Sequence, residues 1–401
     1  MSHIVVIGAG QAGSSLVAKL RSEGFDGDIT LIGAEPVPPY QRPPLSKKYL
    51  LGEMALERLF LRPEQYYADQ NITLKLGTAV TTINALAKTV TLGSETLGYD
   101  QLALTTGSTP RRLPGAIGGD LQGVHVVRDL ADVDQMIPAV NNGGHVLIVG
   151  GGYIGLEAAA VAARKGLQVT VVEMAERILQ RVACAETSDY FRKLHQAHGV
   201  DIIEGAGLER LLGETQVTAA RLSDGREIDV DFVIVGVGIA PATDAAEMAG
   251  VTLENGILVD AKGRTSDPSI WAAGDCAAFP FRGEILRLES VQNAIDQAEA
   301  VARNMLGADI DYVPHPWFWS DQYDVKLQIA GLNLGYNHVV VRQTQDAVSH
   351  WYYTGDTLLA VDAINDPRNY MIGKRLIEAG KSPAPEVIAN PDTDMKALLR
   401  A

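Results

Sequence analysis

The sequence predicts an α/β protein with two Rossmann-like domains and a C-terminal α+β domain. A glycine motif follows a buried apolar strand near residue 8, and the same arrangement recurs near residue 150. After about residue 311, alternating strand patterns rich in aromatic residues replace the earlier succession of strands and helices. One glycine motif is a weak signal, but two complete strand–glycine–helix units in one chain are much more specific.

The first unit opens the chain. Ile4–Ile7 is an apolar run typical of a strand buried on both faces of a parallel sheet. A GxGxxG motif at residues 8–13 follows at once, then a segment compatible with a helix to about Glu23, and a second apolar strand at residues 29–32. The glycines permit a tight turn, a close approach to a pyrophosphate and close helix–strand packing. Glu35 comes next and is placed to accept hydrogen bonds from a ribose diol.

A proline-rich loop follows Glu35, with five prolines between residues 36 and 44. Proline restricts the backbone, so this loop is suited to placing a few side chains, here Arg42 and Lys47. The alternative is a rigid surface connector with solvated charges. Further strands are expected at residues 72–80, 89–92 and 101–107, and a crossing between domains at residues 114–123.

The second unit repeats the first. Residues 145–149 form an apolar strand, and a second GxGxxG motif at residues 150–155 leads into a helix that contains Glu157. The next strand, at residues 168–172, ends beside Glu173. The chain is therefore expected to bind two nucleotide-bearing molecules.

The last third contains one more ligand candidate and the third domain. Asp275 directly follows a glycine at the end of a short strand. At this position it is suited to accept a hydrogen bond from a polyol or a phosphate-linked hydroxyl; the alternative is that it caps the next helix. The tail beyond Pro383 is expected to be loosely held. Strands of the third domain are expected at residues 316–319, 326–330, 338–342, 350–353 and 358–361.

Composition excludes several classes of protein. The 401 residues carry a formal net charge of −15, which disfavours non-specific nucleic-acid binding. With only two cysteines, Cys184 and Cys276, neither a disulfide framework nor a four-cysteine metal site can be built, and no metal is expected. No signal peptide or membrane-spanning run is apparent, so a cytoplasmic protein is expected.

Together these features resemble the FAD-dependent NADH:ferredoxin reductases of bacterial oxygenase systems. The resemblance extends from the first strand to the C-terminal domain. It implies a glutathione-reductase-like fold with an FAD domain at residues 1–115 and 245–312, an NAD domain at 116–244 and a C-terminal domain at 313–401. The motifs that carry it are Arg42-Pro-Pro-Leu-Ser-Lys47, Thr105-Thr-Gly107, Gly150–Glu157, Gly274-Asp275-Cys276, Glu289–Asn293 and Trp317–Gln322.

The resemblance assigns FAD to the first glycine motif and NADH, as substrate, to the second. Trp319 would lie beside the isoalloxazine, although a packed interface aromatic is the alternative. The residues implied for FAD are Gly10, Ala12, Gly13, Glu35, Arg42, Lys47, Val80, Thr106, Gly107, Arg128, Gly274, Asp275, Val291 and Trp319. Those for NAD are Gly150, Gly152, Ile154, Gly155, Glu173 and Gly238.

Two side chains are hypothesised to be catalytic. Lys47 beside the flavin would stabilise negative charge that develops as hydride arrives, and Glu157 would orient it. The alternative is an ordinary interdomain salt bridge. Glu173 is expected to favour NADH, because a 2′-phosphate would face its carboxylate.

The implied partner is a 2Fe–2S ferredoxin that serves a haem-thiolate monooxygenase or, as the alternative, a Rieske dioxygenase. Such ferredoxins are generally acidic, and this chain has 49 acidic against 34 basic residues, so docking requires a local basic patch. Arg303 and Lys326 are the candidates; either is alternatively a solvated surface charge. The protein is expected to be a monomer or a weak dimer.

Three other functions were open from the sequence. A flavin disulfide reductase or thiol peroxidase needs a redox cysteine in the N-terminal half, and no cysteine precedes Cys184, which nearly excludes this class. An NADH oxidase or nitroreductase would pass electrons directly to a small oxidant. An NADH-sensing flavoprotein similar to apoptosis-inducing factor shares the architecture, but no targeting or basic DNA-binding segment supports it.

Overall fold

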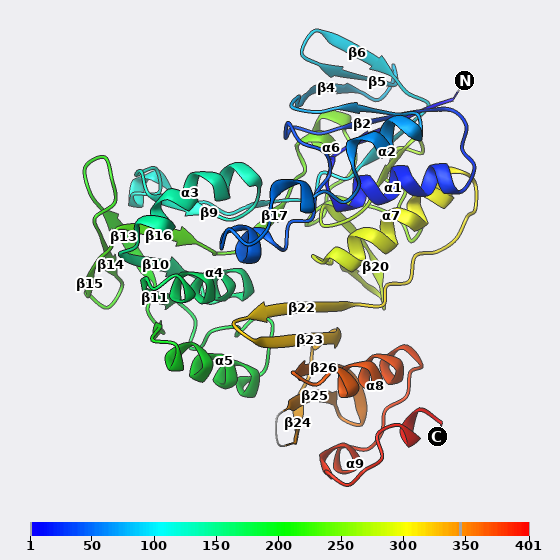
Figure 1. Cartoon of the computed structure of the whole chain (residues 1–401). Helices are drawn as coiled ribbons and strands as arrows, with labels where there is room; N and C mark the ends of the chain where they lie inside the picture. Colours follow the sequence, from blue (N-terminus) through cyan, green and yellow to red (C-terminus); the bar gives the residue numbers. More distant parts are fainter. Residues whose placement is uncertain (1, 345–346, 401) are drawn as a thin grey trace. The chain divides into compact units, whose positions relative to one another are not determined.

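The computed structural model describes residues 2–344 and 347–400 (Figure 1). Contacts between residues divide the chain into two compact units. The first unit comprises Met1–Arg42, Ala55–Thr109 and Ile239–Pro316. The second unit comprises Pro43–Met54, Pro110–Gly238 and Trp317–Ala401. Segments of the expected NAD domain and the expected C-terminal domain thus belong to one unit, and the three-domain division stays a prediction.

The first unit is built on a parallel sheet in the order β19-β7-β1-β2-β3. Its central strand is the expected apolar run, and Ile4, Val5 and Val6 are fully buried because neighbours cover both faces. The strands are β1 (His3–Ile7), β2 (Asp28–Ile32), β3 (Ile72–Lys75), β7 (Gln101–Leu104) and β19 (Ile270–Ala272).

Two helices of this unit, α1 (Gln11–Ser22) and α7 (Val291–Met305), lie side by side, in blue and yellow in Figure 1. Leu16, Leu20 and Val301 from these helices belong to the core on the sheet. Smaller elements are η2 (Leu56–Arg58), α2 (Glu64–Asp69), β4 (Val80–Asn84), β5 (Thr89–Leu92), β6 (Glu95–Gly98), β8 (Ser108–Pro110), β17 (Ile239–Pro241), α6 (Asp244–Ala249), β18 (Ile257–Leu258), β20 (Ala277–Phe281) and β21 (Glu284–Leu286).

The single strand expected at residues 72–80 is wrong. The chain forms β3 and β4 there, and they belong to different sheets. Gly77, between them, has a φ of +67°, a conformation that glycine adopts without the penalty of a Cβ atom. The apolar pattern therefore continued across a turn that the periodicity did not reveal.

The second unit contains a matching parallel sheet in the order β12-β11-β10-β16-β9. Its strands are β9 (Val124–Val126), β10 (His145–Val149), β11 (Gln168–Glu173), β12 (Asp201–Glu204) and β16 (Phe232–Val235). Other elements are η1 (Leu45–Tyr49), η3 (Gly115–Ile117), α3 (Leu130–Asn142), α4 (Tyr153–Arg164), α5 (Ala185–Ala197), β13 (Leu208–Leu212), β14 (Ala219–Leu222) and β15 (Glu227–Asp229).

The C-terminal part of this unit is an antiparallel sheet in the order β22-β23-β26-β25-β24. Helix α8 packs on it, with Trp351, Val361 and Leu376 fully buried between them. The elements are β22 (Trp317–Gln322), β23 (Val325–Gly331), β24 (His338–Gln343), β25 (Val348–Thr354), β26 (Thr357–Ile364), α8 (Pro367–Glu378), α9 (Pro385–Ala389) and η4 (Ala397–Leu399).

The expectation of a loosely held tail beyond Pro383 is also wrong. Ile388 and Met395 are buried in the core of the antiparallel sheet. The guanidinium of Arg342, on β24, donates to the carbonyl oxygens of Ile388 at 2.9 Å and Asn390 at 2.5 Å. One buried cation thus fixes a short irregular segment whose composition carries no such signal.

Among the described residues, none of the helices has the length and apolar content required to cross a membrane.

Candidate dinucleotide and hydride-transfer site

The two GxGxxG motifs adopt the same local structure. Gly8 follows β1 with a φ of +111°, and Gly150 follows β10 with a φ of +108°. A Cβ atom on Gly8 would lie 2.2 Å from the carbonyl oxygen of Thr105, and one on Gly150 would lie 2.4 Å from that of Gly236. Only glycine fits either turn, because both the backbone conformation and the space exclude a side chain.

The remaining glycines of each motif perform the two other expected tasks. A Cβ on Gly13 or Gly155 would lie 2.0 or 2.1 Å from the carbonyl oxygen of the first glycine of its motif, so helix and strand approach closely. Gly10 and Gly152 are the N-cap residues of α1 and α4, and a Cβ there would meet nothing within 4 Å. Each unit therefore presents open space at a helix N-terminus, which fits a pyrophosphate.

The N-terminus of α7 lies close to the glycine motif at the N-terminus of α1. A Cβ on Gly274 would lie 3.0 Å from the Cβ of Ala12, in the first turn of α1, and 3.7 Å from that of Ala294, near the start of α7. The partial positive ends of both helices thus lie near Gly274 and Asp275. This concentration of positive potential fits an anionic dinucleotide in the first unit.

The predicted ribose acceptor Glu35 is held by two neighbours from the proline-rich loop. Its Oε1 atom is 2.5 Å from Nη2 of Arg42, and its Oε2 accepts a hydrogen bond from the Tyr40 hydroxyl at 2.6 Å. Sequence reasoning named Arg42 and Glu35 but not Tyr40, whose position two residues before Arg42 was the available signal. The loop therefore orients the carboxylate rather than merely connecting two elements.

The other residues predicted for FAD divide between the units. In the first unit, the Thr106 hydroxyl donates to the carbonyl oxygen of Ala242 at 2.6 Å, and Asp275 Oδ2 accepts from the Ser108 hydroxyl at 3.0 Å. Val80 begins β4 and Val291 begins α7. The predicted residues of the first unit are Gly10, Ala12, Gly13, Glu35, Arg42, Val80, Thr106, Gly107, Gly274, Asp275 and Val291, and those of the second unit are Lys47, Arg128 and Trp319.

The residues predicted for NAD all belong to the second unit. At the end of β11, Glu173 Oε2 accepts from the backbone N–H of Gly151 at 2.7 Å, and Oε1 accepts from that of Ala175 at 2.8 Å. Two backbone donors fix this carboxylate at the edge of the glycine turn. Ile154 is exposed at the start of α4, and Gly238 follows β16.

The structure brings Lys47 and Glu157 together. Nζ of Lys47, in η1, lies 2.6 Å from Oε2 of Glu157, on α4, and this carboxylate is almost fully buried. Two hydroxyls to which the sequence assigned no site role also bind it: Ser46 donates to Oε2 at 2.9 Å and Ser320 to Oε1 at 2.7 Å. The pairing is a fact of the fold, and its catalytic role stays a prediction.

Trp319 lies half-buried in β22, within an aromatic group. Its ring centroid is 5.5 Å from that of Trp317 and 6.3 Å from that of Phe318. Because side chains alternate along a strand, Trp319 and Ser320 point to opposite faces of β22. The strand thus presents Trp317 and Trp319 on one face, and Phe318 together with the polar contact from Ser320 to Glu157 on the other.

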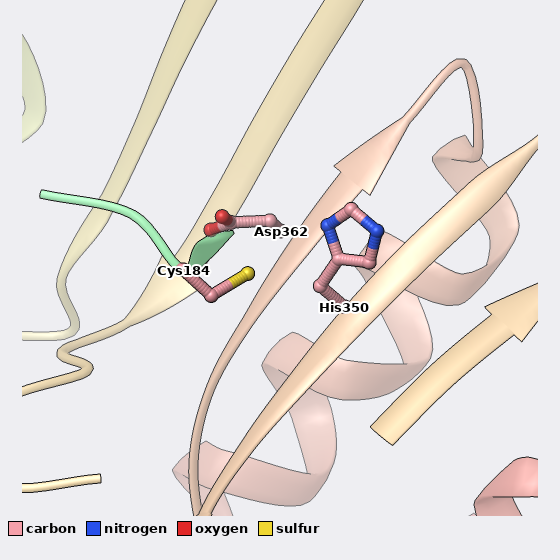
Figure 2. A group of neighbouring side chains, drawn as sticks. All are labelled: Cys184, His350 and Asp362. Carbon is pink, nitrogen blue, oxygen red and sulfur yellow. The ribbon is translucent and has the colours of Figure 1, made fainter. Parts of the chain in front are cut away.

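Figure 2 shows the one group of neighbouring side chains within the described ranges that has the composition of a metal site: Cys184, His350 and Asp362. Their candidate ligand atoms lie within 4.8 Å of one another. The hydroxyl of Thr187 lies among them, 2.7 Å from Nδ1 of His350 and 2.8 Å from Oδ2 of Asp362. The Tyr352 hydroxyl also donates to Oδ2 of Asp362. Because hydroxyl groups already hydrogen-bond to Nδ1 of His350 and to Oδ2 of Asp362, we interpret the group as a buried polar network.

The two cysteines are not a redox pair within either unit. Cys184 is in the second unit and Cys276 in the first, and both thiols are free and buried. Burial raises the pKa of the Cys184 thiol to about 11 and raises that of Cys276 as well, which disfavours the nucleophilic thiolate.

The buried histidines predict a fall in stability on acidification. Burial lowers the pKa of His195 and of His350 to about 4. Below about pH 6.5 the unfolded chain takes up protons that the folded chain does not, so stability is lost as the pH falls toward 4. Burial raises the pKa of Asp362 to about 6, which acts in the opposite direction and offsets one histidine.

This effect is measured by chemical unfolding between pH 7 and pH 4. The free energy of unfolding should fall less steeply with decreasing pH in the His195→Gln variant, by up to about 1.4 kcal/mol per pH unit. His338, exposed on β24, is the control, and its replacement by glutamine should leave the slope unchanged. An unaltered slope in the His195→Gln variant would contradict the assignment.

Known families and structures resemble the whole chain. Residues 2–298 match the pyridine nucleotide-disulphide oxidoreductase family, and residues 317–399 match the reductase C-terminal family. The chain is 44% identical to a ferredoxin–NAD(P)⁺ reductase of Sphingomonas sp, with 94% of this chain and 92% of that protein covered. It is 41% identical to rhodocoxin reductase of Rhodococcus erythropolis, with 99% and 94% covered. The reductase fold in the crystal structure of the covalent putidaredoxin reductase–putidaredoxin complex matches it with a TM-score of 0.95 and 37% identity, over 100% of this chain and 98% of that one.

Proposed function

Because the chain belongs to the pyridine nucleotide-disulphide oxidoreductase family, we propose that it is an NADH-dependent ferredoxin reductase. Proteins of this kind use FAD and NAD(P)H. The observation that carries the proposal is the repeated glycine cradle at the N-termini of α1 and α4, together with the buried Lys47–Glu157 pair. The full-length similarity to ferredoxin reductases supports the assignment of the acceptor.

The proposed roles follow from the contacts of each residue. Bound FAD would accept a hydride from NADH and release the electrons singly. The first glycine motif would hold the FAD pyrophosphate, with Glu35 oriented by Arg42 toward a ribose. The second motif would hold NADH, with Glu173 at the adenosine ribose. Lys47 would place its positive charge where negative charge develops, and Glu157 would keep that ammonium in position.

The acceptor is proposed to be a 2Fe–2S ferredoxin, because a flavin converts a two-electron donor into single electrons. The names of the relatives rhodocoxin reductase and putidaredoxin reductase support a redoxin as the partner. By the resemblance, the terminal enzyme is a haem-thiolate monooxygenase, with a Rieske dioxygenase as the alternative. The genes next to the one that encodes this chain would identify the ferredoxin and the terminal oxygenase.

The acceptor is tested by comparing two activities of the FAD-loaded protein. We expect NADH oxidation in air to be slow, and cytochrome c reduction to rise strongly when a 2Fe–2S ferredoxin is added. Equal NADH oxidation with and without ferredoxin would instead indicate an NADH oxidase. Tight NADH binding without turnover to either acceptor would favour the NADH-sensing alternative.

The predicted docking residues lie in different units and are tested separately. Arg303, on α7, is partly exposed and forms an ion pair with Glu23 at 3.1 Å, which Lys19 also contacts at 2.7 Å. This cluster has a net charge of +1. Lys326 is exposed on β23, where its cross-strand neighbour is Asp321.

Charge reversal at either residue is expected to weaken ferredoxin-dependent turnover. Arg303→Glu or Lys326→Glu should raise the apparent ferredoxin KM about tenfold at low salt, because attraction becomes repulsion, and the effect should shrink as salt increases. Steady-state cytochrome c reduction across a salt series is the measurement. Arg210→Glu, on the exposed face of β13, is the matched control. Docking lies elsewhere if both variants retain the wild-type KM and salt dependence.

A further inference from the structure

Glu157 is the end point of a buried chain of hydrogen bonds that crosses the second unit. Its Oε1 atom accepts from Ser320 at 2.7 Å, and the Ser320 hydroxyl accepts from Nε2 of Gln322 at 3.2 Å. Oε1 of Gln322 is 2.7 Å from Nε2 of His195, on α5. Nδ1 of His195 is 3.2 Å from the hydroxyl of Tyr323. This chain of hydrogen bonds links three elements, α4, β22 and α5.

The strand geometry explains why these residues meet. Ser320 and Gln322 are two positions apart in β22, so they point to the same face, and both are fully buried. Phe318 lies on that face as well and packs against Tyr153 of α4 at a ring distance of 5.1 Å. Tyr153 and Glu157 are four residues apart and share one face of α4. The polar contact therefore sits beside an apolar contact that fixes the strand on the helix.

All donors in this chain point toward Glu157. The carboxylate can only accept, so Ser320 must donate to it and must accept from the amide group of Gln322. The amide oxygen of Gln322 then faces His195, which donates from Nε2 and accepts from Tyr323 at Nδ1. This arrangement requires a neutral imidazole, and its burial favours that form. Aligned hydrogen bonds polarise one another, so the whole chain supports negative charge on Glu157.

We propose that Ser320 and Gln322, backed by His195, are positioning residues for hydride transfer that act through Glu157 on Lys47. Lys47 and Ser46 bind Oε2 of Glu157, whereas Ser320 binds Oε1. Without Ser320, only one oxygen of the carboxylate is held and the Glu157 side chain is free to rotate. The Lys47 ammonium, whose hydrogen bonds are to Glu157 and to the carbonyl oxygen of Pro43, then loses its fixed position. This inference rests on the proposed function of the Lys47–Glu157 pair.

The test compares Ser320→Ala with Ser349→Ala. Ser349 is equally buried in the same antiparallel sheet, but its hydroxyl accepts from Trp351 and has no link to Glu157. In rapid-mixing experiments on the FAD-loaded protein, Ser320→Ala should lower the limiting rate of flavin reduction by NADH about tenfold, as expected for one lost hydrogen bond to a charged group. The dissociation constant for NADH should stay unchanged, Ser349→Ala should behave as wild type, and Ser320→Thr should restore most of the rate.

A second measurement is independent of activity. Chemical unfolding of Ser320→Ala, Glu157→Gln and the double variant gives a double-mutant cycle. The two changes should be non-additive, so that the double variant unfolds at nearly the same denaturant concentration as Glu157→Gln alone. The corresponding cycle with Ser349→Ala should be additive.

The outcomes separate this inference from the proposed function. Additive effects in the Ser320 cycle, or a reduction rate in Ser320→Ala equal to that of Ser349→Ala, would overturn the positioning role. If Lys47→Ala leaves reduction unchanged, the proposed function of the pair fails, and with it the catalytic part of the inference. The double-mutant cycle would still measure the structural coupling between Ser320 and Glu157.

Discussion

Alanine at position 47 is expected to slow the reduction of bound flavin by NADH about a hundred- to a thousandfold, the loss typical of removing one group that stabilises developing negative charge. The Lys47 side chain is only 18% exposed, so little water can replace its charge. It is held by a carboxylate that is itself bound by two serine hydroxyls. The expected effect is therefore on the rate of the chemical step rather than on NADH binding.

Rapid mixing of the FAD-loaded variant with NADH measures this rate directly. Lys48→Ala is the matched control, because Lys48 is the next residue in the same turn and its side chain is exposed. Lys47→Met should be as slow as Lys47→Ala, since it keeps the length of the side chain but not the charge. Thermal unfolding of each variant separates a catalytic loss from a loss of fold. A wild-type reduction rate in Lys47→Ala would show that the pair is only a structural salt bridge.

The second large effect concerns the choice of nucleotide: kcat/KM for NADH is expected to exceed that for NADPH about ten- to a hundredfold. Both carboxylate oxygens of Glu173 are bound by backbone N–H groups, so the side chain cannot turn away from a 2′-phosphate. At about 4 Å and an effective dielectric near 20, two unit charges repel by roughly 4 kcal/mol. Solvent reduces this, and a residual of about 1.4–2.8 kcal/mol corresponds to the stated preference.

The arginines near Glu173 differ in how far they can relieve this repulsion. Arg177 follows Glu173 by four residues, but its guanidinium is bound to the carbonyl oxygens of Ala183 and Cys184 and to the hydroxyl of Ser188. Arg181 is exposed and therefore well solvated. Neither is expected to cancel the preference for NADH.

Steady-state kinetics with both nucleotides measure the preference. Glu173→Gln should bring the two efficiencies within about threefold of each other, because the charge is removed while most of the shape remains. Glu176→Gln, an exposed neighbour in the same loop, should retain the wild-type preference. Equal efficiency with NADH and NADPH in the unaltered protein would refute the role of Glu173.

The elements that depend only on neighbouring residues could be predicted from the amino-acid sequence. A buried parallel strand requires a continuous apolar run, and the turn after it requires glycine where a Cβ would lie 2.2 Å from a carbonyl oxygen. Both constraints act within about ten residues, so β1, α1, β10 and α4 were predicted close to their observed bounds. The pairing of Lys47 with Glu157 was anticipated from the place of each residue in the sequence, Lys47 in the proline-rich loop and Glu157 two residues after the last glycine of the second motif.

The contacts around these elements could not be predicted, because they join segments that are far apart in the sequence. Ser320 lies 163 residues from Glu157, and Gln322 lies 127 residues from His195. No periodic pattern links such positions, because contacts between distant segments leave no repeat in the sequence. The same reason explains the tail, which Arg342 holds through backbone carbonyl oxygens that every residue possesses. Local sequence thus specified where nucleotides can bind, whereas the packing of β22 and α5 on α4 determined how the Glu157 carboxylate is held.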